Sequence, residues 1–168
     1  MSDTGAPARD SAARRSGKYL TFVLQDEEYG IEILKVREII GVMAITTVPG
    51  APAYVTGVIN LRGSIIPVVD LRRKFGMEPA DRTAETCIIV VDVPLTTEGV
   101  MMGILVDTVS EVLDIAGDQI EPPPRFGRDV RLEFILGMGK VKGKVKILLD
   151  IDRVLGADEL GLIRGIAA

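Results

Sequence analysis

Residues 57–76 read GVINLRGSIIPVVDLRRKFG, and the chain repeats this element without a gap at residues 137–156 as GMGKVKGKVKILLDIDRVLG. The two copies share their end glycines, a turn glycine, an aspartate, an arginine and several apolar positions. A second set recurs with matching spacing: Gly30, Ile31, Val36 and Glu38 return as Gly103, Ile104, Val109 and Glu111. The chain is therefore an internal duplication, and the seam between two copies of one fold is a natural binding place.

Composition favours a β-rich protein that binds other proteins. Apolar residues make up 47% of the 168 residues, whereas aromatic residues make up only 4%. Valine and isoleucine dominate the apolar set, and β-branched residues favour strands. The apolar content predicts more hydrophobic surface than one core needs, and the net charge of −4 argues against a general affinity for nucleic-acid phosphates.

The ends of the chain and its long uncharged stretch indicate where the protein works. The N-terminus lacks the apolar core of a signal peptide, and prolines and glycines interrupt the uncharged run at residues 39–61. We therefore expect a cytoplasmic protein without direct membrane insertion, whose residues 1–16 form a disordered tail. The single cysteine, Cys87, is interpreted as a small buried apolar side chain.

Alternating apolar and polar residues predict about ten short antiparallel strands in two equivalent sets. Residues 57–61 and 64–70, for example, are expected to form a hairpin with its tip at residues 60–63. Two small five-stranded barrels would accommodate these strands, because closure removes exposed edges. We expect a mostly β domain at residues 17–166, with approximate repeats at 17–85 and 86–156. Exchange of strands between the repeats is left open, and an amphipathic helix is expected at residues 151–164.

The sequence offers little for catalysis. It contains no histidine, one cysteine and no glycine-rich phosphate loop before a helix, so we expect no catalytic residues, no metal site and no cofactor. The one provocative feature is the pair of repeat-equivalent aspartates, Asp70 and Asp150, because paired aspartates share a proton in acid proteases. The residues that follow them do not fit such a dyad. We therefore interpret both aspartates as N-caps of short helices.

One cue points to nucleic acid instead. The hairpin at residues 140–146 reads KVKGKVK, and strict alternation would place its four lysines on one face. A solvated strand face has the same pattern, and no aromatic residues accompany it for base stacking. A nucleic-acid-binding protein that uses the hairpin Lys140–Lys146 is therefore kept as the alternative function.

Several motifs, taken in order, carry a family resemblance. They are DEEYGIEILKVREI at residues 26–39, GVINLRG at 57–63, PVVDLR at 67–72 and VDTVSEVL at 106–113. Together they make the chain resemble the CheW family of bacterial chemotaxis coupling proteins, over roughly residues 19–163. The resemblance implies two SH3-like barrels in a non-enzymatic adaptor that links the cytoplasmic tips of methyl-accepting chemotaxis receptors to the regulatory domain of the histidine kinase CheA. It also implies recruitment to membrane-associated receptor arrays. The same domain occurs fused to other modules in this family, but the short flanks predict a free-standing adaptor.

The resemblance also implies which residues meet each partner. The receptor-binding groove would lie between the lobes and is expected to contain Ile33, Val36, Glu38, Ile39, Gly57, Arg62 and Val109. Arg62 at the hairpin tip is predicted to form a structural salt bridge with Glu38. For the kinase, the candidates are Phe126 and Pro124, since an aromatic residue after a proline run has little entropy to lose on binding.

Overall fold

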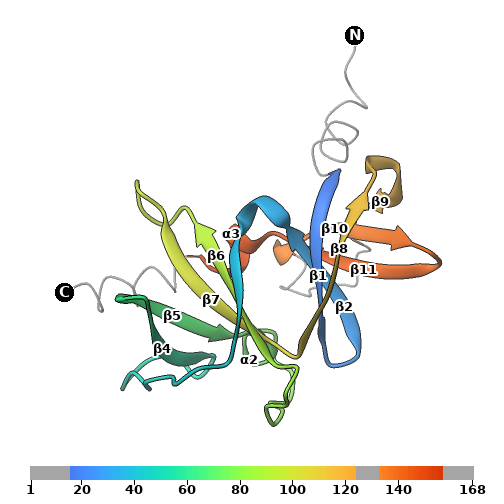
Figure 1. Ribbon diagram of the computed structural model, residues 1–168. Helices are drawn as coiled ribbons and strands as arrows, with labels where there is room; N and C mark the ends of the chain where they lie inside the picture. The colour runs from blue at the N-terminus through green and yellow to red at the C-terminus, as the bar shows by residue number, and fades with distance from the viewer. Residues whose placement is uncertain (1–15, 124–132, 157–168) are drawn as a thin grey trace.

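The strands of the protein form two sheets in the computed structural model, which describes residues 16–123 and 133–156 (Figure 1). The first sheet has the order β8-β1-β2-β11-β10-β9 and the second the order β3-β6-β7-β5-β4. The strands of the first sheet are β1 (Gly17–Leu24), β2 (Glu27–Glu32), β8 (Thr108–Ile115), β9 (Ile120–Glu121), β10 (Ile135–Val141) and β11 (Lys144–Leu149). Those of the second are β3 (Val36–Gly41), β4 (Val55–Leu61), β5 (Ser64–Asp70), β6 (Cys87–Val93) and β7 (Val100–Val106). Short helices are η1 (Ile33–Lys35), α2 (Leu71–Lys74), η2 (Gly117–Gln119) and α3 (Ile151–Val154).

Each sheet takes strands from both repeats. In the first sheet, β1 and β2 join β8, β10 and β11 of the second repeat, and in the second sheet β6 and β7 join β3, β4 and β5 of the first repeat. Matching parallel pairs, β2 with β11 and β7 with β5, close the exchange in both sheets. We call the first sheet and its helix α3 lobe 1, and the second sheet and its helix α2 lobe 2. The expected mostly β fold with two lobes and short helices is confirmed, but the first sheet has six strands instead of five, because the two-residue strand β9 pairs with β10 at its edge.

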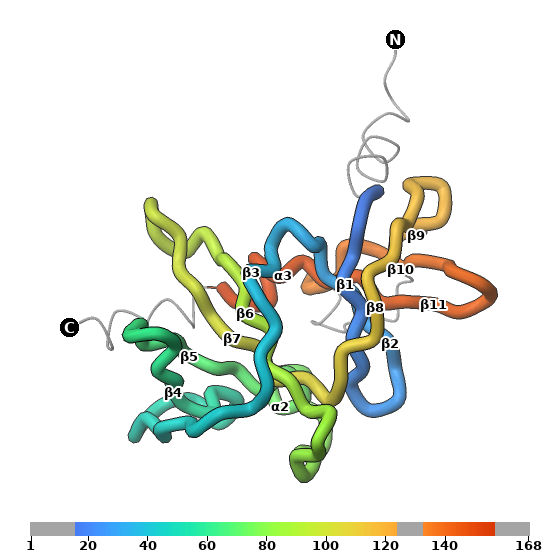
Figure 2. Tube along the Cα trace, in the orientation of Figure 1, coloured from blue at the N-terminus to red at the C-terminus, as the bar shows by residue number. Residues whose placement is uncertain are grey.

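Within the described ranges, the chain passes between the two sheets at two places. The first crossover is η1, Ile33–Lys35, which leads from β2 into β3. The second crossover is the single residue Asp107, which separates β7 from β8. Each crossover therefore begins a strand that belongs to the other lobe (Figure 2).

The repeat-equivalent aspartates cap the two short helices. Asp70 Oδ1 accepts a hydrogen bond from the Arg72 amide at 3.0 Å, and Asp150 Oδ1 accepts one from the Asp152 amide at 3.1 Å. The N-cap interpretation is thus confirmed, since each carboxylate satisfies an amide that the helix leaves unpaired. Helix α3 ends at Val154, earlier than expected, and the rest of the predicted helix beyond residue 156 lies outside the described residues.

The lysine hairpin does not have the arrangement that strict alternation predicts. Lys142 lies in the turn of this hairpin, with a positive φ. Across the turn, Lys140 pairs with Val145, and Val141 pairs with Lys144. Because directly opposite residues point to the same face, Lys140 lies on the face opposite Lys144. Lys146 is buried and pairs with Glu28 at 2.7 Å, so it is not available to a ligand. The prediction of four lysines on one face is wrong, because the two-residue turn shifts the alternation between strands.

Among the described residues, the buried apolar side chains form three hydrophobic clusters. Lobe 2 has its own core around Ile59, Ile66 and Ile88, and lobe 1 has a smaller one around Tyr19 and Leu148. The largest cluster joins the lobes: side chains of β1 and β2 pack with those of β6, β7, α2 and α3. Burial of this shared core is the main attraction between the lobes, because the hydrophobic effect scales with the apolar area removed from water.

Candidate functional site

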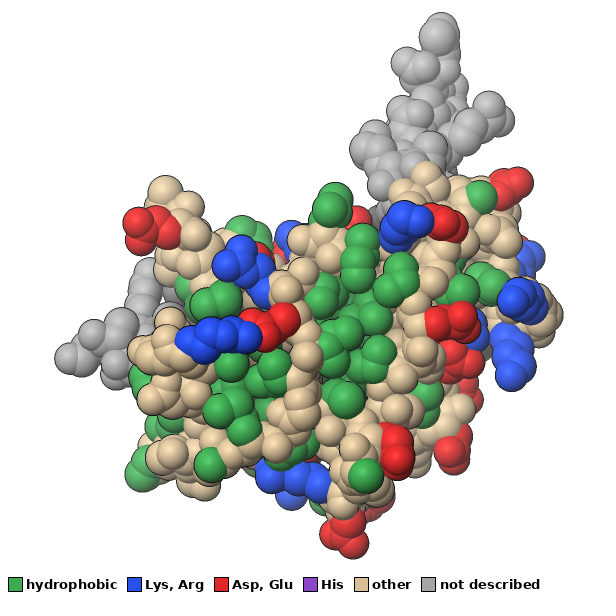
Figure 3. Space-filling model, in the orientation of Figure 1, with side chains coloured by type: hydrophobic (Ala, Val, Ile, Leu, Met, Phe, Trp, Pro, Cys, Tyr) green, Lys and Arg blue, Asp and Glu red, His purple; other side chains and the backbone are tan. Residues whose placement is uncertain are grey.

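An apolar face lies between the lobes, and its walls are β3 of lobe 2 and β8 of lobe 1. Hydrophobic side chains gather in the middle of the molecule between these two strands (Figures 2 and 3). Val36 and Val109 are half-buried and pack against the shared core, as does Ile33 in the first crossover. We define the interlobe face as the repeat-equivalent residues Val36 and Ile39 of β3 with Val109 and Val112 of β8.

Two equivalent β-bulges create this face. Val36 pairs with Val91 and Ile39 with Ile89, but one extra residue of β3 intervenes between Val36 and Glu38. Without the bulge, residues three apart in a strand would point to opposite faces. With it, Val36 and Ile39 both lie on the side of the sheet where Val91 and Ile89 contribute to the shared core.

The second repeat has the same irregularity. Val112 pairs with Leu20 and Val109 with Phe22, with one extra residue in β8 between them. Leu20 and Phe22 both belong to the shared core, so Val109 and Val112 lie on one face. Ile39 and Val112 remain 43% and 49% exposed. A pair of exposed apolar side chains at equivalent places on two walls is a surface suited to a protein partner.

A bidentate ion pair lies on the other side of β3 from Val36 and Ile39, because Glu38 pairs with Val90. Arg62 Nη1 and Nη2 each donate a hydrogen bond of 2.7 Å to one carboxylate oxygen of Glu38. Arg62 sits in the turn between β4 and β5 with φ of 51°, followed by Gly63 with φ of 89°. The Asn60 side chain stabilises this turn, since its Oδ1 accepts a hydrogen bond from the Gly63 amide at 2.8 Å. The hydrogen bonds from Arg62 lower the pKa of Glu38, so the pair stays charged at neutral pH.

Gly57 allows a close approach of two backbone segments, a role that the expected groove assignment does not include. Its φ is 149°, and a Cβ added there would lie 2.2 Å from the carbonyl oxygen of Thr46. The segment around Thr46 approaches this closely because Thr46 and Val58 exchange two backbone hydrogen bonds of 2.8 Å. Among the other expected site residues, Pro124 and Phe126 lie outside the described residues.

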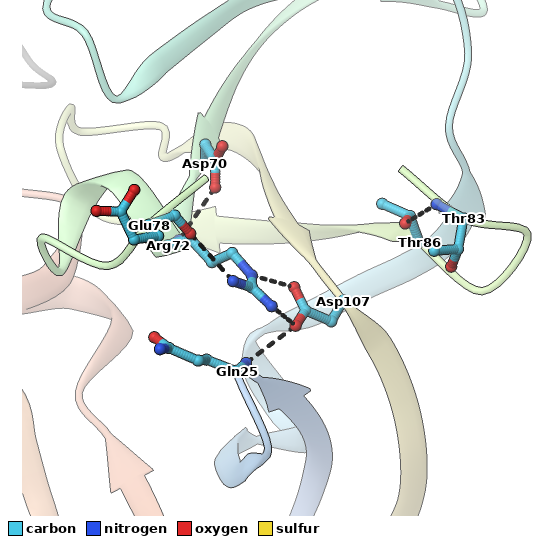
Figure 4. A network of polar contacts seen from close by, with 7 residues as sticks. All are labelled: Gln25, Asp70, Arg72, Glu78, Thr83, Thr86 and Asp107. Carbon is cyan, nitrogen blue, oxygen red and sulfur yellow. Dashed lines mark hydrogen bonds and ion pairs between the residues drawn. The ribbon is translucent and has the colours of Figure 1, made fainter. Parts of the chain in front are cut away.

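Sequence reasoning missed a polar network at the second crossover (Figure 4). Arg72 Nε donates a hydrogen bond of 2.7 Å to Asp107 Oδ1, and Arg72 Nη2 donates one to Asp107 Oδ2. Asp107 Oδ2 also accepts a hydrogen bond of 2.9 Å from the Gln25 amide in the β1–β2 turn. The Asp107 amide in turn donates to the carbonyl of Val23 at 3.1 Å. No sequence spacing links these residues, although Arg72 stands in the repeated helix motif.

This network is charged under ordinary conditions. Burial alone would raise the pKa of Asp107, but hydrogen bonds from Arg72 and the Gln25 amide outweigh it and hold the pKa below its ordinary value of 3.8. The hydrogen bonds to Asp107 likewise raise the pKa of Arg72 above its ordinary value. Because the folded-state pKa of Asp107 lies below the unfolded one, the unfolded chain binds the proton more readily.

Acid should therefore weaken the protein through Asp107. The stabilisation from its low pKa is fully present above about pH 5 and is lost as the pH falls through the folded-state pKa. Urea unfolding at several pH values should show that Asp107→Asn costs most at neutral pH and least near pH 3. An equal cost of the substitution at every pH would contradict this expectation.

The described residues present no evident metal site. Within residues 16–123 and 133–156, no group of three or more His, Cys, Asp or Glu side chains is placed to hold a metal ion. Cys87 is half-buried and lies 3.1 Å from the carbonyl oxygen of Glu85. Over the same ranges, helices long and apolar enough to cross a membrane are also absent.

Known proteins resemble this chain over most of its length. Residues 18–159 match the family model described as the CheW-like domain. The chemotaxis protein CheW of Klebsiella aerogenes is 38% identical over 150 residues, which cover 89% of this chain and 88% of the relative. The protein of the same name in Bacillus subtilis is 31% identical over 141 residues, covering 82% and 86%. The crystal structure of the scaffolding protein TtCheW from Thermoanaerobacter tengcongensis superposes with a TM-score of 0.75 at 34% identity, covering 84% of this chain and 94% of that one.

Proposed function

The chain belongs to the CheW-like family, and on that premise we propose that it is a non-enzymatic adaptor coupling chemoreceptors to the histidine kinase CheA. The interlobe face is the observation that carries the proposal. It exposes apolar side chains from two strands that belong to different lobes, on a scaffold held by a shared core. An adaptor requires such a rigid apolar contact surface and no reactive group.

The receptor would bind as a helix laid along the interlobe face. A helix with its side chains is about 10 to 12 Å wide and presents apolar residues in a stripe along one side. Val36 and Ile39 would contact that stripe from β3, while Val109 and Val112 would contact it from β8. This is the helix-in-groove mode of recognition, in which apolar anchors supply most of the affinity.

The ion pair between Glu38 and Arg62 would orient the helix. Both residues project from lobe 2, and the Arg62 side chain is 69% exposed although it holds Glu38 at both oxygens. Charges at the rim of an interface contribute mainly to orientation and to the association rate. The pair would thus act on the partner rather than on the stability of the fold.

Arg62→Ala should reduce the affinity for a receptor cytoplasmic fragment by about tenfold, because the charge-assisted hydrogen bonds between Arg62 and Glu38 would no longer orient the bound helix. Its melting temperature should stay close to that of the unchanged chain, since the pair is exposed. Copurification with receptor fragment and CheA would measure this, alongside Arg62→Lys, which keeps the charge but not the bidentate geometry.

Arg153→Ala provides the matched control, because the Arg153 side chain is similarly exposed, at 67%, and lies outside the interlobe face. It should bind both partners normally. Unfolding of Arg62→Ala, or normal binding by it, would refute the assigned role. Failure of the unchanged chain to retain either receptor or kinase would refute the adaptor function itself.

The kinase contact is proposed from the sequence alone. Phe126 and Pro124 remain the candidates, and Phe126→Ala should lose CheA in the same copurification while keeping the receptor fragment. We also propose that the protein is recruited through these partners to receptor arrays at the cytoplasmic membrane surface. The altered geometry of the lysine hairpin leaves the nucleic-acid alternative without support.

A further inference from the structure

Both crossovers between the lobes are fastened by ion pairs to the short helices. At the second crossover, Asp107 is bound by Arg72 of α2. At the first crossover, Lys35 Nζ lies 2.8 Å from Asp152 Oδ2 of α3. These four side chains are between 16% and 34% exposed, so both pairs are better shielded from water than an ordinary surface ion pair.

The two pairs occupy corresponding places in the duplicated fold but have opposite polarity. Arg72 and Asp152 are the second residues of α2 and α3, and they align in the repeated 20-residue element. In the alignment that matches Val36 with Val109, Asp107 corresponds to Leu34, and Lys35 is the next residue. The first of these ion pairs thus has its cation on the helix, and the second has its cation on the crossover. The molecule itself shows that either polarity can serve at this place.

The crossovers lead directly into the walls of the interlobe face. Lys35 is followed at once by β3, and Asp107 is followed at once by β8. A shift of either crossover would therefore move a whole wall relative to the other lobe. Oδ1 of Asp152 is buried without a hydrogen-bond partner among the described residues, which leaves Lys35 to neutralise that carboxylate.

We propose that the ion pairs Arg72–Asp107 and Lys35–Asp152 act as two latches that set the spacing of β3 and β8, and thereby control binding at the interlobe face without touching the bound helix. The binding part of this inference rests on the proposed receptor function. These four residues are positioning residues, since they join the crossovers to the short helices and lie outside the interlobe face. A ligand that requires one wall spacing loses affinity when the free protein samples several spacings.

A charge-swap cycle tests the first latch. Arg72→Asp and Asp107→Lys would each place like charges together, and their combination would rebuild the pair with the polarity of the other latch. Spin labels at Thr97→Cys in lobe 2 and Lys142→Cys in lobe 1, in a Cys87→Ser background, report the distance between the lobes. Each single variant should broaden that distance distribution and weaken binding of a receptor cytoplasmic fragment by about tenfold. The double variant regains the ion pair but not the hydrogen bond that Asp107 accepts from the Gln25 amide, so its distance distribution should be narrower and its binding tighter than those of either single variant.

A matched control separates the latch from a general effect of charge. Glu121→Lys makes a comparable reversal of charge in β9, outside both walls, where Glu121 pairs with Lys140 inside one sheet and both side chains are well exposed. It should leave the distance distribution and the affinity unchanged. Should Arg72→Asp fail to fold, the milder variants Lys35→Gln and Asp152→Asn at the other latch provide the same measurement.

The distance measurement keeps the inference separate from the proposed function. If the unchanged chain binds no receptor fragment, the adaptor function fails, but the distance distributions still decide whether the latches hold the lobes. Single variants with the distribution of the unchanged chain would overturn the inference. A double variant that stays as broad as either single variant would overturn it as well.

Discussion

Ile39→Glu is expected to lower the affinity for a receptor helix on the order of a hundredfold, because a bound helix would bury the new carboxylate without a partner. The side chain is 43% exposed in the free protein, so the substitution should change the melting temperature little. Titration of a receptor cytoplasmic fragment, followed by calorimetry, measures the affinity. The same samples give the melting temperature.

Val145→Glu is the matched control for this prediction. Val145 is 52% exposed in the β10–β11 hairpin, whose tip lies at the outer end of lobe 1, on the side of β8 that faces away from β3 (Figure 2). The same change in charge there should leave binding of the receptor fragment intact. Equal losses for the two variants would mean that charge, and not the interlobe face, governs the interaction.

Gly57→Ala is expected to cost about 3 kcal/mol of folding free energy, from backbone strain at its positive φ and from the collision with Thr46. The Thr46 oxygen belongs to the backbone and is held by hydrogen bonds to Val58, so it cannot simply turn aside. Urea denaturation would show a lower midpoint with an unchanged slope.

Gly41→Ala tests whether the cost comes from this close approach. Gly41 ends β3, and a Cβ added to it would have no atom within 4 Å. It should be tolerated with a change of less than about 0.5 kcal/mol. A stable Gly57→Ala protein with poor receptor binding would instead return Gly57 to the role of keeping the groove open.

Local structure was predictable wherever short-range chemistry decides it. The hairpin expected at residues 57–61 and 64–70 is found as β4 and β5, because its turn sequence permits the positive φ angles at Arg62 and Gly63. The caps at Asp70 and Asp150 likewise follow from the preference of helix ends for a side-chain acceptor. These features depend on a few adjacent residues, which the repeat presents twice.

Longer-range geometry was not predictable from the pattern. The bulges that bring Val36 and Ile39 to one face, and Val109 and Val112 likewise, depend on pairing with strands far along the chain. The prediction for the lysine hairpin is wrong for a related reason, because the strict alternation on which it rests is interrupted by the turn between β10 and β11. The ion pair between Arg72 and Asp107 likewise depends on the pairing of β5 with β7, two strands that come from different repeats.

The reciprocal exchange of strands has a consequence for how the protein is made. β1 cannot pair with β8, through Phe22 and Val109, until β8 has been synthesised. In the same way, β2 waits for β11, because Tyr29 pairs with Ile147. A nascent chain that ends before residue 100 therefore holds orphan strands of both lobes and a finished sheet of neither. Such distant pairing slows folding, because chain ends must meet before their contacts form. Both lobes should therefore fold together, in one cooperative step late in synthesis.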